Sequence, residues 1–180
     1  MALEHAILVS LSERSGSGYE LAHRFEKSIG LFWSATHQQI YRVLKRMEEA
    51  GWVAVETVAQ DGRPDKKVHT VSAAGRTELR RWLAEPNASA GPQELAVKLR
   101  GASFGDEKAV AEELARHRAA HAERLDAYRR IEKRDFPAPT SGRALHQYLV
   151  LRGGIRAEEG QVEWLDEVVS ALQSDEKDAR

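Results

Sequence analysis

The sequence predicts a mainly helical protein in which a two-stranded ribbon lies between helices of the N-terminal half. Apolar residues recur at helical spacing within residues 3–11, 19–29 and 37–50, and after Gly51 the period changes from 3.6 to 2. The second half of the chain contains long helical patterns and no strand pattern. With 180 residues, 42% of them hydrophobic, the chain can bury a core in one domain or in two small ones.

The first two predicted elements are short helices. The first contains five apolar residues at helical spacing, namely Leu3, Ala6, Ile7, Leu8 and Leu11. The segment SGSGYE then interrupts the pattern. The second helix starts near Tyr19 and presents Leu21, Phe25 and Ile29 on one face.

The third helix has the clearest signals in the chain. Its apolar stripe consists of Ile40, Val43, Leu44 and Met47. Thr36 and Gln39 have the spacing of a capping box, and Gly51 is placed to end the helix, with Trp52 as the hydrophobic partner just beyond it. The outward face carries donors and cations only: His37, Gln38, Gln39, Arg42, Lys45 and Arg46.

Two strands and a fourth helix complete the first block. The segments WVAVETV and KVHTVS are rich in β-branched residues and flank AQDGRPDK, which we expect to form a turn too long for a two-residue hairpin. Ser72 can cap a fourth helix, AAGRTELRRWLAE, and PNASAGP then ends the block. We therefore expect one domain over residues 1–86 and a second over residues 87–180.

The second domain is predicted to be helical throughout. A short helix carries Leu95, Leu99 and Ala102, and a long one follows from Asp106 to Asp135, with a heptad-like seam of Val110, Leu114, His117, His121, Leu125, Tyr128 and Ile131. The last helical region has an apolar stripe interrupted by Gly153, Gly154 and Gly160. Because such helices do not easily close a core alone, we expect a second copy of the chain to cover them. The expected dimer interface is Tyr148, Leu149, Val162, Trp164, Leu165, Val169 and Leu172.

Three helices, a ribbon and a capped helix with a polar outer face describe a winged helix-turn-helix, in which the second helix of the motif enters the major groove of DNA. Glutamine amides can pair with adenine, an arginine can bind guanine with two hydrogen bonds, and lysines near the ribbon tip can contact phosphate. The candidate DNA-binding residues are Tyr19, Thr36, His37, Gln38, Gln39, Tyr41, Arg42, Lys45, Arg63, Lys66 and Lys67.

Composition and motifs exclude several other classes. The net charge of −1 indicates that any basic surface is local, and the absence of cysteine excludes disulfides and thiolate sites. With no signal peptide pattern and no apolar run of membrane-spanning length, we expect a cytoplasmic protein without a membrane partner. His117 and His121 have no obvious third ligand, and no catalytic constellation is visible, so we expect no metal, no cofactor and no enzyme activity.

Two stretches also resemble a known family. GYELAHRFEKSIGLFWSATHQQIYRVLKRMEEAGWV, followed by GRPDKKVHTVSAAGRTELRRWL, resembles the winged domain of the PadR family of bacterial transcriptional regulators. HQYLVLRGGIRAEEGQVEWLDEV is similar to the end of that family's longer C-terminal domain. The resemblance implies a homodimeric repressor with a double-stranded DNA operator, usually of a neighbouring gene. It also implies release by a small molecule, which is a hydroxycinnamic acid in the phenolic-acid-responsive branch.

Two questions stay open at the level of sequence. An aromatic acid effector would fit a junction between the domains formed by Arg14 and His37 with His146, Tyr148 and Arg156. The pair Gly153 and Gly154 would either leave room for that ligand or let two helices approach closely. The alternative function is a winged-helix adaptor that binds proteins rather than DNA, because a fold alone does not give a function.

Overall fold

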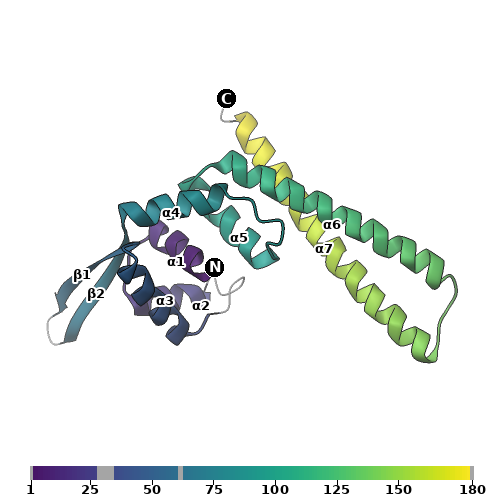
Figure 1. The fold of residues 1–180 in the computed structure, drawn as a ribbon, viewed down its shortest axis with the longest axis horizontal. Helices are drawn as coiled ribbons and strands as arrows, with labels where there is room; N and C mark the ends of the chain where they lie inside the picture. Colours follow the sequence, from purple (N-terminus) through teal and green to yellow (C-terminus); the bar gives the residue numbers. More distant parts are fainter. Residues whose placement is uncertain (1, 28–34, 61–62, 179–180) are drawn as a thin grey trace. The chain divides into compact units, whose positions relative to one another are not determined.

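The computed structural model describes residues 2–27, 35–60 and 63–178 (Figure 1). The chain divides into two compact units, Met1–Val110 and Ala111–Arg180. The boundary after residue 86 stays a prediction. The first compact unit extends beyond that residue and includes α5 (Pro92–Gly101), which packs against α1 (Ala2–Glu13). The mainly helical fold class, with a two-stranded ribbon, is as the sequence predicts.

Helix α1 is the centre of the first unit. Its residues from Glu4 to Leu11 are all buried, and it packs against the elements around it: α2 (Gly18–Lys27), α3 (His37–Glu49), β2 (Arg63–Val71), α4 (Ala73–Ala84) and α5. Ile7, Leu8 and Val9, three buried apolar residues in succession, face different sides of the helix, while the buried polar residues of α1 are Glu4, His5 and Ser10. The predicted Ile29 lies outside the described residues.

Helix α3 begins and ends as the sequence predicts. Its buried side chains are Ile40, Val43, Leu44 and Met47, and the capping box between Thr36 and Gln39 is formed. At its end, Gly51 has a φ of +71°. The Gly51 amide donates to Glu48 O at 3.0 Å and the Trp52 amide donates to Met47 O at 2.8 Å, which is a Schellman motif.

Strand β1 (Val53–Gln60) pairs antiparallel with β2, in a register that runs from Val53 opposite Val71 to Gln60 opposite Arg63. We call this ribbon the wing. The expected long turn is wrong: both strands extend into AQDGRPDK, so that only residues 61–62 lie between them. The dipeptide Asp61-Gly62 is a two-residue hairpin signal, and Pro64 is compatible with a strand that has a free edge.

Helix α4 starts against the end of α3. Ser72 caps the helix by accepting a hydrogen bond from the Gly75 amide at 3.0 Å, and its hydroxyl donates to Gly51 O at 2.6 Å. The Ser72 amide also donates to Trp52 O at 3.0 Å. Gly75 therefore faces the Trp52 carbonyl, and a Cβ added to Gly75 would lie 2.1 Å from that oxygen. This close approach fixes the wing and α4 relative to α3.

A buried imidazole links α1 to α4. The ring of His5 stacks on Trp82 with 4.4 Å between centroids and an interplanar angle of 7°, and its Nε2 lies 3.0 Å from Glu78 Oε1. Arg81 also donates to Glu78. The hydrogen bond from Arg81, together with a weaker one from His5, lowers the pKa of Glu78 from 4.5 to about 2.

This pair gives an expected pH dependence. Because the folded-state pKa of Glu78 is depressed, its contribution to stability is present above about pH 4.5 and is lost as the pH falls toward 2. Glu78→Gln should lower the free energy of unfolding at pH 7 by about 1 kcal/mol. The difference from wild type should shrink between pH 5 and pH 2 in urea titrations. Glu49→Gln, an exposed change at the end of α3, should leave the urea midpoint unchanged; a pH-independent difference for Glu78→Gln would contradict the ion-pair explanation.

The second unit is a helical hairpin. Most of α6 (Glu107–Asp135) lies antiparallel to α7 (Gly142–Asp178). Among the described residues, five ion pairs join the two helices: Arg118 with Asp166, His121 and Arg124 with Glu158, Arg129 with Glu159, and Arg152 with Glu132. The seam predicted for α6 is buried or half-buried along its length. Among the described residues, no helix is long and apolar enough to cross a membrane.

Helix α7 continues without a break through the three glycines that interrupt its apolar stripe. A Cβ on Gly154 would lie 3.1 Å from Cε2 of Tyr128, so this glycine lets α6 and α7 approach closely, which answers the question left by the sequence for Gly154. No atom of the described residues lies within 4 Å of the corresponding positions on Gly153 and Gly160. The short segment Ala102–Phe104, a 3-10 helix, joins α5 to the start of α6.

Candidate nucleic-acid interface

The outward face of α3 is polar and accessible. Gln38, Arg42 and Lys45 are exposed, whereas the opposite face of the helix is buried in the core. Neither Arg42 nor Lys45 forms an ion pair with any residue that the structure describes. The local sequence produces this arrangement, because apolar residues at steps of three and four leave the polar residues between them facing solvent.

Two residues at the start of α3 already have partners. Gln39 Oε1 accepts hydrogen bonds from the Thr36 amide at 2.8 Å and from Thr36 Oγ1 at 3.2 Å, so Gln39 and Thr36 stabilise the helix start. His37 Nε2 lies 2.8 Å from Glu26 Oε1 on α2. Hydrogen bonds from His37 and then from His23 lower the pKa of Glu26. Gln38 and Arg42 are therefore more accessible to a base edge than Gln39 is.

Two tyrosines lie beside this face. Tyr19 is 66% exposed and Tyr41 is 49% exposed, values that are large for aromatic side chains. Tyr41 lies against the start of α2, where a Cβ on Gly18 would be 2.5 Å from Tyr41 Cε1. Glycine at position 18 thus allows α2 and α3 to approach closely enough for both rings to reach the same surface.

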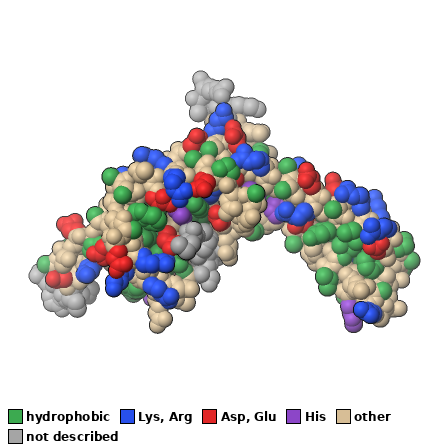
Figure 2. Space-filling model, viewed as in Figure 1, with side chains coloured by type: hydrophobic (Ala, Val, Ile, Leu, Met, Phe, Trp, Pro, Cys, Tyr) green, Lys and Arg blue, Asp and Glu red, His purple; other side chains and the backbone are tan. Residues whose placement is uncertain are grey.

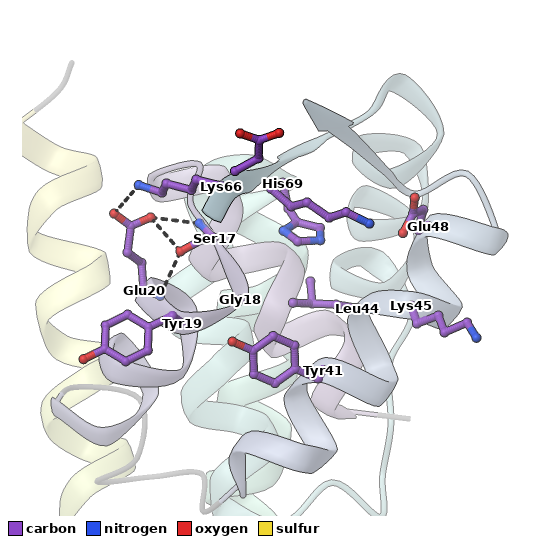
Figure 3. A pocket seen from close by; sticks show the side chains of 12 residues that line it. Ser17, Gly18, Tyr19, Glu20, Tyr41, Leu44, Lys45, Glu48, Lys66 and His69 are labelled. Atoms are coloured by element: carbon purple, nitrogen blue, oxygen red, sulfur yellow. Dashed lines mark hydrogen bonds and ion pairs between the residues drawn. The ribbon is translucent and has the colours of Figure 1, made fainter. Parts of the chain in front are cut away.

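A groove of about 740 Å³ runs between the start of α2, the middle of α3 and strand β2 (Figure 3). Besides the two tyrosines, it is lined by three lysines and three carboxylates: Lys45, Lys66, Lys67, Glu20, Glu48 and Asp65. The groove brings together five of the candidate residues that the sequence predicts on α2, α3 and the wing. Its formal charge is balanced, because the three lysines are matched by the three carboxylates.

Lys66 and Glu20 connect the wing to α2. Lys66 Nζ lies 2.7 Å from Glu20 Oε1, while Glu20 Oε2 accepts hydrogen bonds from the Ser17 amide at 2.8 Å and the Ser17 hydroxyl at 3.1 Å (Figure 3). The hydrogen bond from Lys66 and the one from the Ser17 amide lower the pKa of Glu20 to about 2. The carboxylate is therefore ionised at every pH at which the protein is expected to work.

His69 anchors the base of the wing. Its backbone exchanges hydrogen bonds with Gly16 at 2.9 and 3.2 Å, and its side chain is 8% exposed. Burial lowers the pKa of the imidazole below 6.5, and its Nδ1 has no hydrogen-bond partner among the described residues. The sequence analysis missed Glu20 and His69. The spacing of Ser17 and Glu20, which is that of a capping box, could have identified Glu20.

Two candidates on the wing differ from Lys66. Lys67 is exposed on β2, opposite Thr57 on β1, and no ion pair joins it to a described residue. Arg63 is the first residue of β2, but its side chain is not among those that the structure describes.

The predicted dimer interface divides into buried and exposed residues. Leu165 is 0% exposed within a single chain, so it belongs to the hairpin core. Tyr148 donates a hydrogen bond to Glu132 at 3.3 Å, and four further residues of the set are half-buried, namely Val162, Trp164, Val169 and Leu172. Hydrophobic side chains gather on the part of the hairpin near the connection between α6 and α7 (Figure 2). Three large hydrophobic residues of α7 are exposed: Leu145, Leu149 and Val150, at 37%, 56% and 77%, and we call them the α7 patch.

The candidate effector residues lie in both units. In the first unit, Arg14 is exposed, its carbonyl accepts a hydrogen bond from Arg24 at 2.6 Å, and His37 is paired with Glu26. In the second unit, His146 and Arg156 are exposed, and Tyr148 packs against Phe136 with 5.4 Å between ring centroids. The effector site stays a prediction.

Family models match both halves of the chain. Residues 7–81 match the Transcriptional regulator PadR-like family and residues 93–173 match Virulence activator alpha C-term. The chain is 56% identical to the probable transcriptional regulator Rv1176c of Mycobacterium tuberculosis, over 96% of this chain and 98% of the relative. It is 27% identical to the negative transcriptional regulator PadR of Bacillus subtilis, with the same coverage. A crystal structure of Bacillus subtilis PadR in complex with operator DNA is 26% identical, covers 96% of this chain and 99% of its own, and has a TM-score of 0.47.

Proposed function

Because the chain belongs to the PadR-like family of transcriptional regulators, we propose that it binds operator DNA as a homodimer, through α3 and the wing of each chain, and represses transcription. The family consists of regulators rather than enzymes, as the sequence predicts. Repression is supported by the name of the Bacillus subtilis relative, a negative transcriptional regulator.

The observation that carries DNA binding is the exposed face of α3. Gln38 and Arg42 are exposed one turn apart at the N-terminal half of the helix, which is the part of a recognition helix that contacts base edges. An amide can pair with adenine and a guanidinium with guanine. Lys45 and Tyr41 are exposed on the same helix, where they suit contacts with phosphate.

A two-fold dimer would bind an operator that contains two related half-sites. Two copies of α3 related by a two-fold axis contact half-sites that are about 10 base pairs apart, or a multiple of that spacing, so we expect a pseudo-palindrome. The α7 patch of Leu145, Leu149 and Val150 is the apolar surface on the second unit that a partner chain would cover. The residues Tyr148, Val162, Trp164, Val169 and Leu172, which are half-buried in one chain, could extend that interface.

The role of Arg42 has a measurable consequence. Arg42→Ala should weaken binding to the operator by about 1–3 kcal/mol and relax the preference for one base position in each half-site. Lys67→Ala should weaken binding to all sequences alike and reduce the salt slope by about 1. Both effects can be measured by fluorescence anisotropy with an operator found by footprinting and with a random duplex of the same length.

Arg80→Ala is the matched control for Arg42→Ala, because Arg80 is exposed on α4 and lies outside the groove. Its affinity for both duplexes should equal that of the wild type. If Arg42→Ala and Lys67→Ala bind the operator as the wild type does, the proposed DNA surface is wrong. If the wild type binds no duplex even at low salt, the adaptor function is favoured instead.

Release by a small aromatic acid remains the second part of the prediction. The resemblance to the phenolic-acid-responsive branch implies such an effector, and Arg14, His37, His146, Tyr148 and Arg156 are its candidate residues. A ligand can release DNA only if it binds one dimer geometry better than the other. We therefore expect hydroxycinnamic acids to lower operator affinity rather than only to bind.

A further inference from the structure

We propose that Glu20 competes with DNA phosphate for Lys66, so that the contact between the wing and the DNA backbone is weakened by a carboxylate of the protein itself. The proposal rests on the function proposed above, because it concerns the same surface. It assigns to Glu20 a negative contribution to DNA affinity that is the same for every DNA sequence.

The carboxylate is held in place for this role. One oxygen of Glu20 accepts both hydrogen bonds from Ser17, and the other oxygen lies 2.7 Å from Lys66 Nζ. The Glu20 amide in turn donates to Ser17 Oγ at 3.2 Å. Because Glu20 is fixed by the start of α2, its free oxygen is oriented toward Lys66 at little further cost in side-chain entropy. Figure 3 shows the pair at one end of the groove.

The surroundings of the pair make Lys66 the lysine that is restrained. All three lysines line the groove, but Lys45 and Lys67 are exposed, whereas Lys66 is half-buried. The other two carboxylates of the groove, Glu48 and Asp65, form no ion pair with a described residue. Glu20 is thus the carboxylate of the groove that holds a lysine directly.

Binding to phosphate has to compete with this contact. A phosphate oxygen that approaches Lys66 either takes the place of the Glu20 carboxylate or binds another N–H of the same ammonium, and in both cases two negative charges come close together. The exchange involves the backbone of DNA and not a base, so its cost does not depend on sequence. The preference of α3 for its operator should therefore be independent of Glu20, while the affinity for any duplex should depend on it.

The test compares Glu20→Gln with the wild type on a random duplex and on the operator. Glutamine keeps the capping box with Ser17, so the helix start is retained while the charge opposite Lys66 is removed. We expect about threefold tighter binding to both duplexes and a salt slope steeper by about 0.9, the value for one additional phosphate contact. Thermal unfolding followed by circular dichroism checks that the fold is unchanged.

Two controls make the result specific. Glu85→Gln changes the net charge of the protein by the same amount at an exposed residue next to the C-terminal end of α4, and should leave affinity and salt slope at the wild-type values. In the Lys66→Met background, adding Glu20→Gln should give a clearly smaller gain, because the competed lysine is absent and only the repulsion between Glu20 and phosphate is removed. Affinity of Glu20→Gln equal to that of the wild type, or a gain of undiminished size in the Lys66→Met background, would overturn the proposal. If no variant and no wild type bind DNA, the proposed function itself fails.

Discussion

Val150→Asp is expected to separate the two chains of the dimer and to lower operator affinity by about a hundredfold or more. Val150 is 77% exposed in one chain, and Leu149 beside it is 56% exposed, so neither contributes much to the stability of the hairpin. In a dimer that covers the α7 patch, an aspartate would be buried without a partner, which is unfavourable by several kcal/mol. Separate monomers would then bind the two half-sites independently and would lose the gain in affinity that one dimer obtains by binding both.

The measurements are light scattering and DNA binding on the same samples. The wild type should have twice the chain mass of 20.1 kDa, and Val150→Asp should have the mass of one chain. Val58→Asp makes the same exchange at an exposed valine of β1 and should leave the mass unchanged. A monomeric wild type at micromolar concentration, or a dimeric Val150→Asp, would show that the patch is not the interface.

The sequence alone suggests Leu165 rather than Val150 for this test. Leu165 has the stronger apolar context in the sequence, yet it is 0% exposed within its own chain. Leu165→Asp would unfold the hairpin and so report on the fold rather than on the contact between chains.

Gly75→Ala is expected to lower the free energy of unfolding by about 3 kcal/mol and the melting temperature by about 6–12 °C. Alanine normally stabilises a helix relative to glycine. At position 75, however, the new Cβ would lie 2.1 Å from the carbonyl oxygen of Trp52, a backbone atom that cannot move without displacing the start of the wing. The loss should be visible in both thermal and urea unfolding.

Gly160→Ala is the control for this prediction. Gly160 is also inside a helix, but no atom of the described residues lies within 4 Å of its Cβ position. The exchange should leave stability unchanged or raise it by about 0.5–1 kcal/mol. A melting temperature of Gly75→Ala equal to that of the wild type would mean that the contact between α4 and Trp52 yields easily.

The parts of the fold that could be predicted are those determined by neighbouring residues. The start and end of α3 depend on Thr36, Gln39 and Gly51, and all three signals lie within the helix or no more than two residues beyond it. The wing was predicted with strands that are too short, because a strand pattern ends in the sequence where polar residues begin, whereas hydrogen bonding in the ribbon continues to Gln60 and Arg63.

The candidate site was harder to predict from the sequence, because part of it depends on contacts between residues that are far apart in the chain. The face of α3 follows from helical periodicity, so Gln38 and Arg42 could be identified in advance. The contact between Glu20 and Lys66 joins residues 46 positions apart and depends on how the wing folds back on α2. Likewise, the exposure of Val150 depends on which face of α7 meets α6, and a broad apolar stripe does not determine this.

The burial of α1 on every side has a consequence for synthesis on the ribosome. This helix is made before the elements that cover it, and although α2 and α3 follow soon, it also packs against α4 and α5, and Glu13 binds Arg100, a residue 87 positions later. Part of its apolar surface therefore stays uncovered until the chain as far as Arg100 has left the exit tunnel, which takes on the order of 5–20 s at about 5–20 residues per second. During that interval the nascent chain exposes apolar side chains such as Ile7, Leu8 and Val9, and transiently exposed surface of this kind is prone to aggregation.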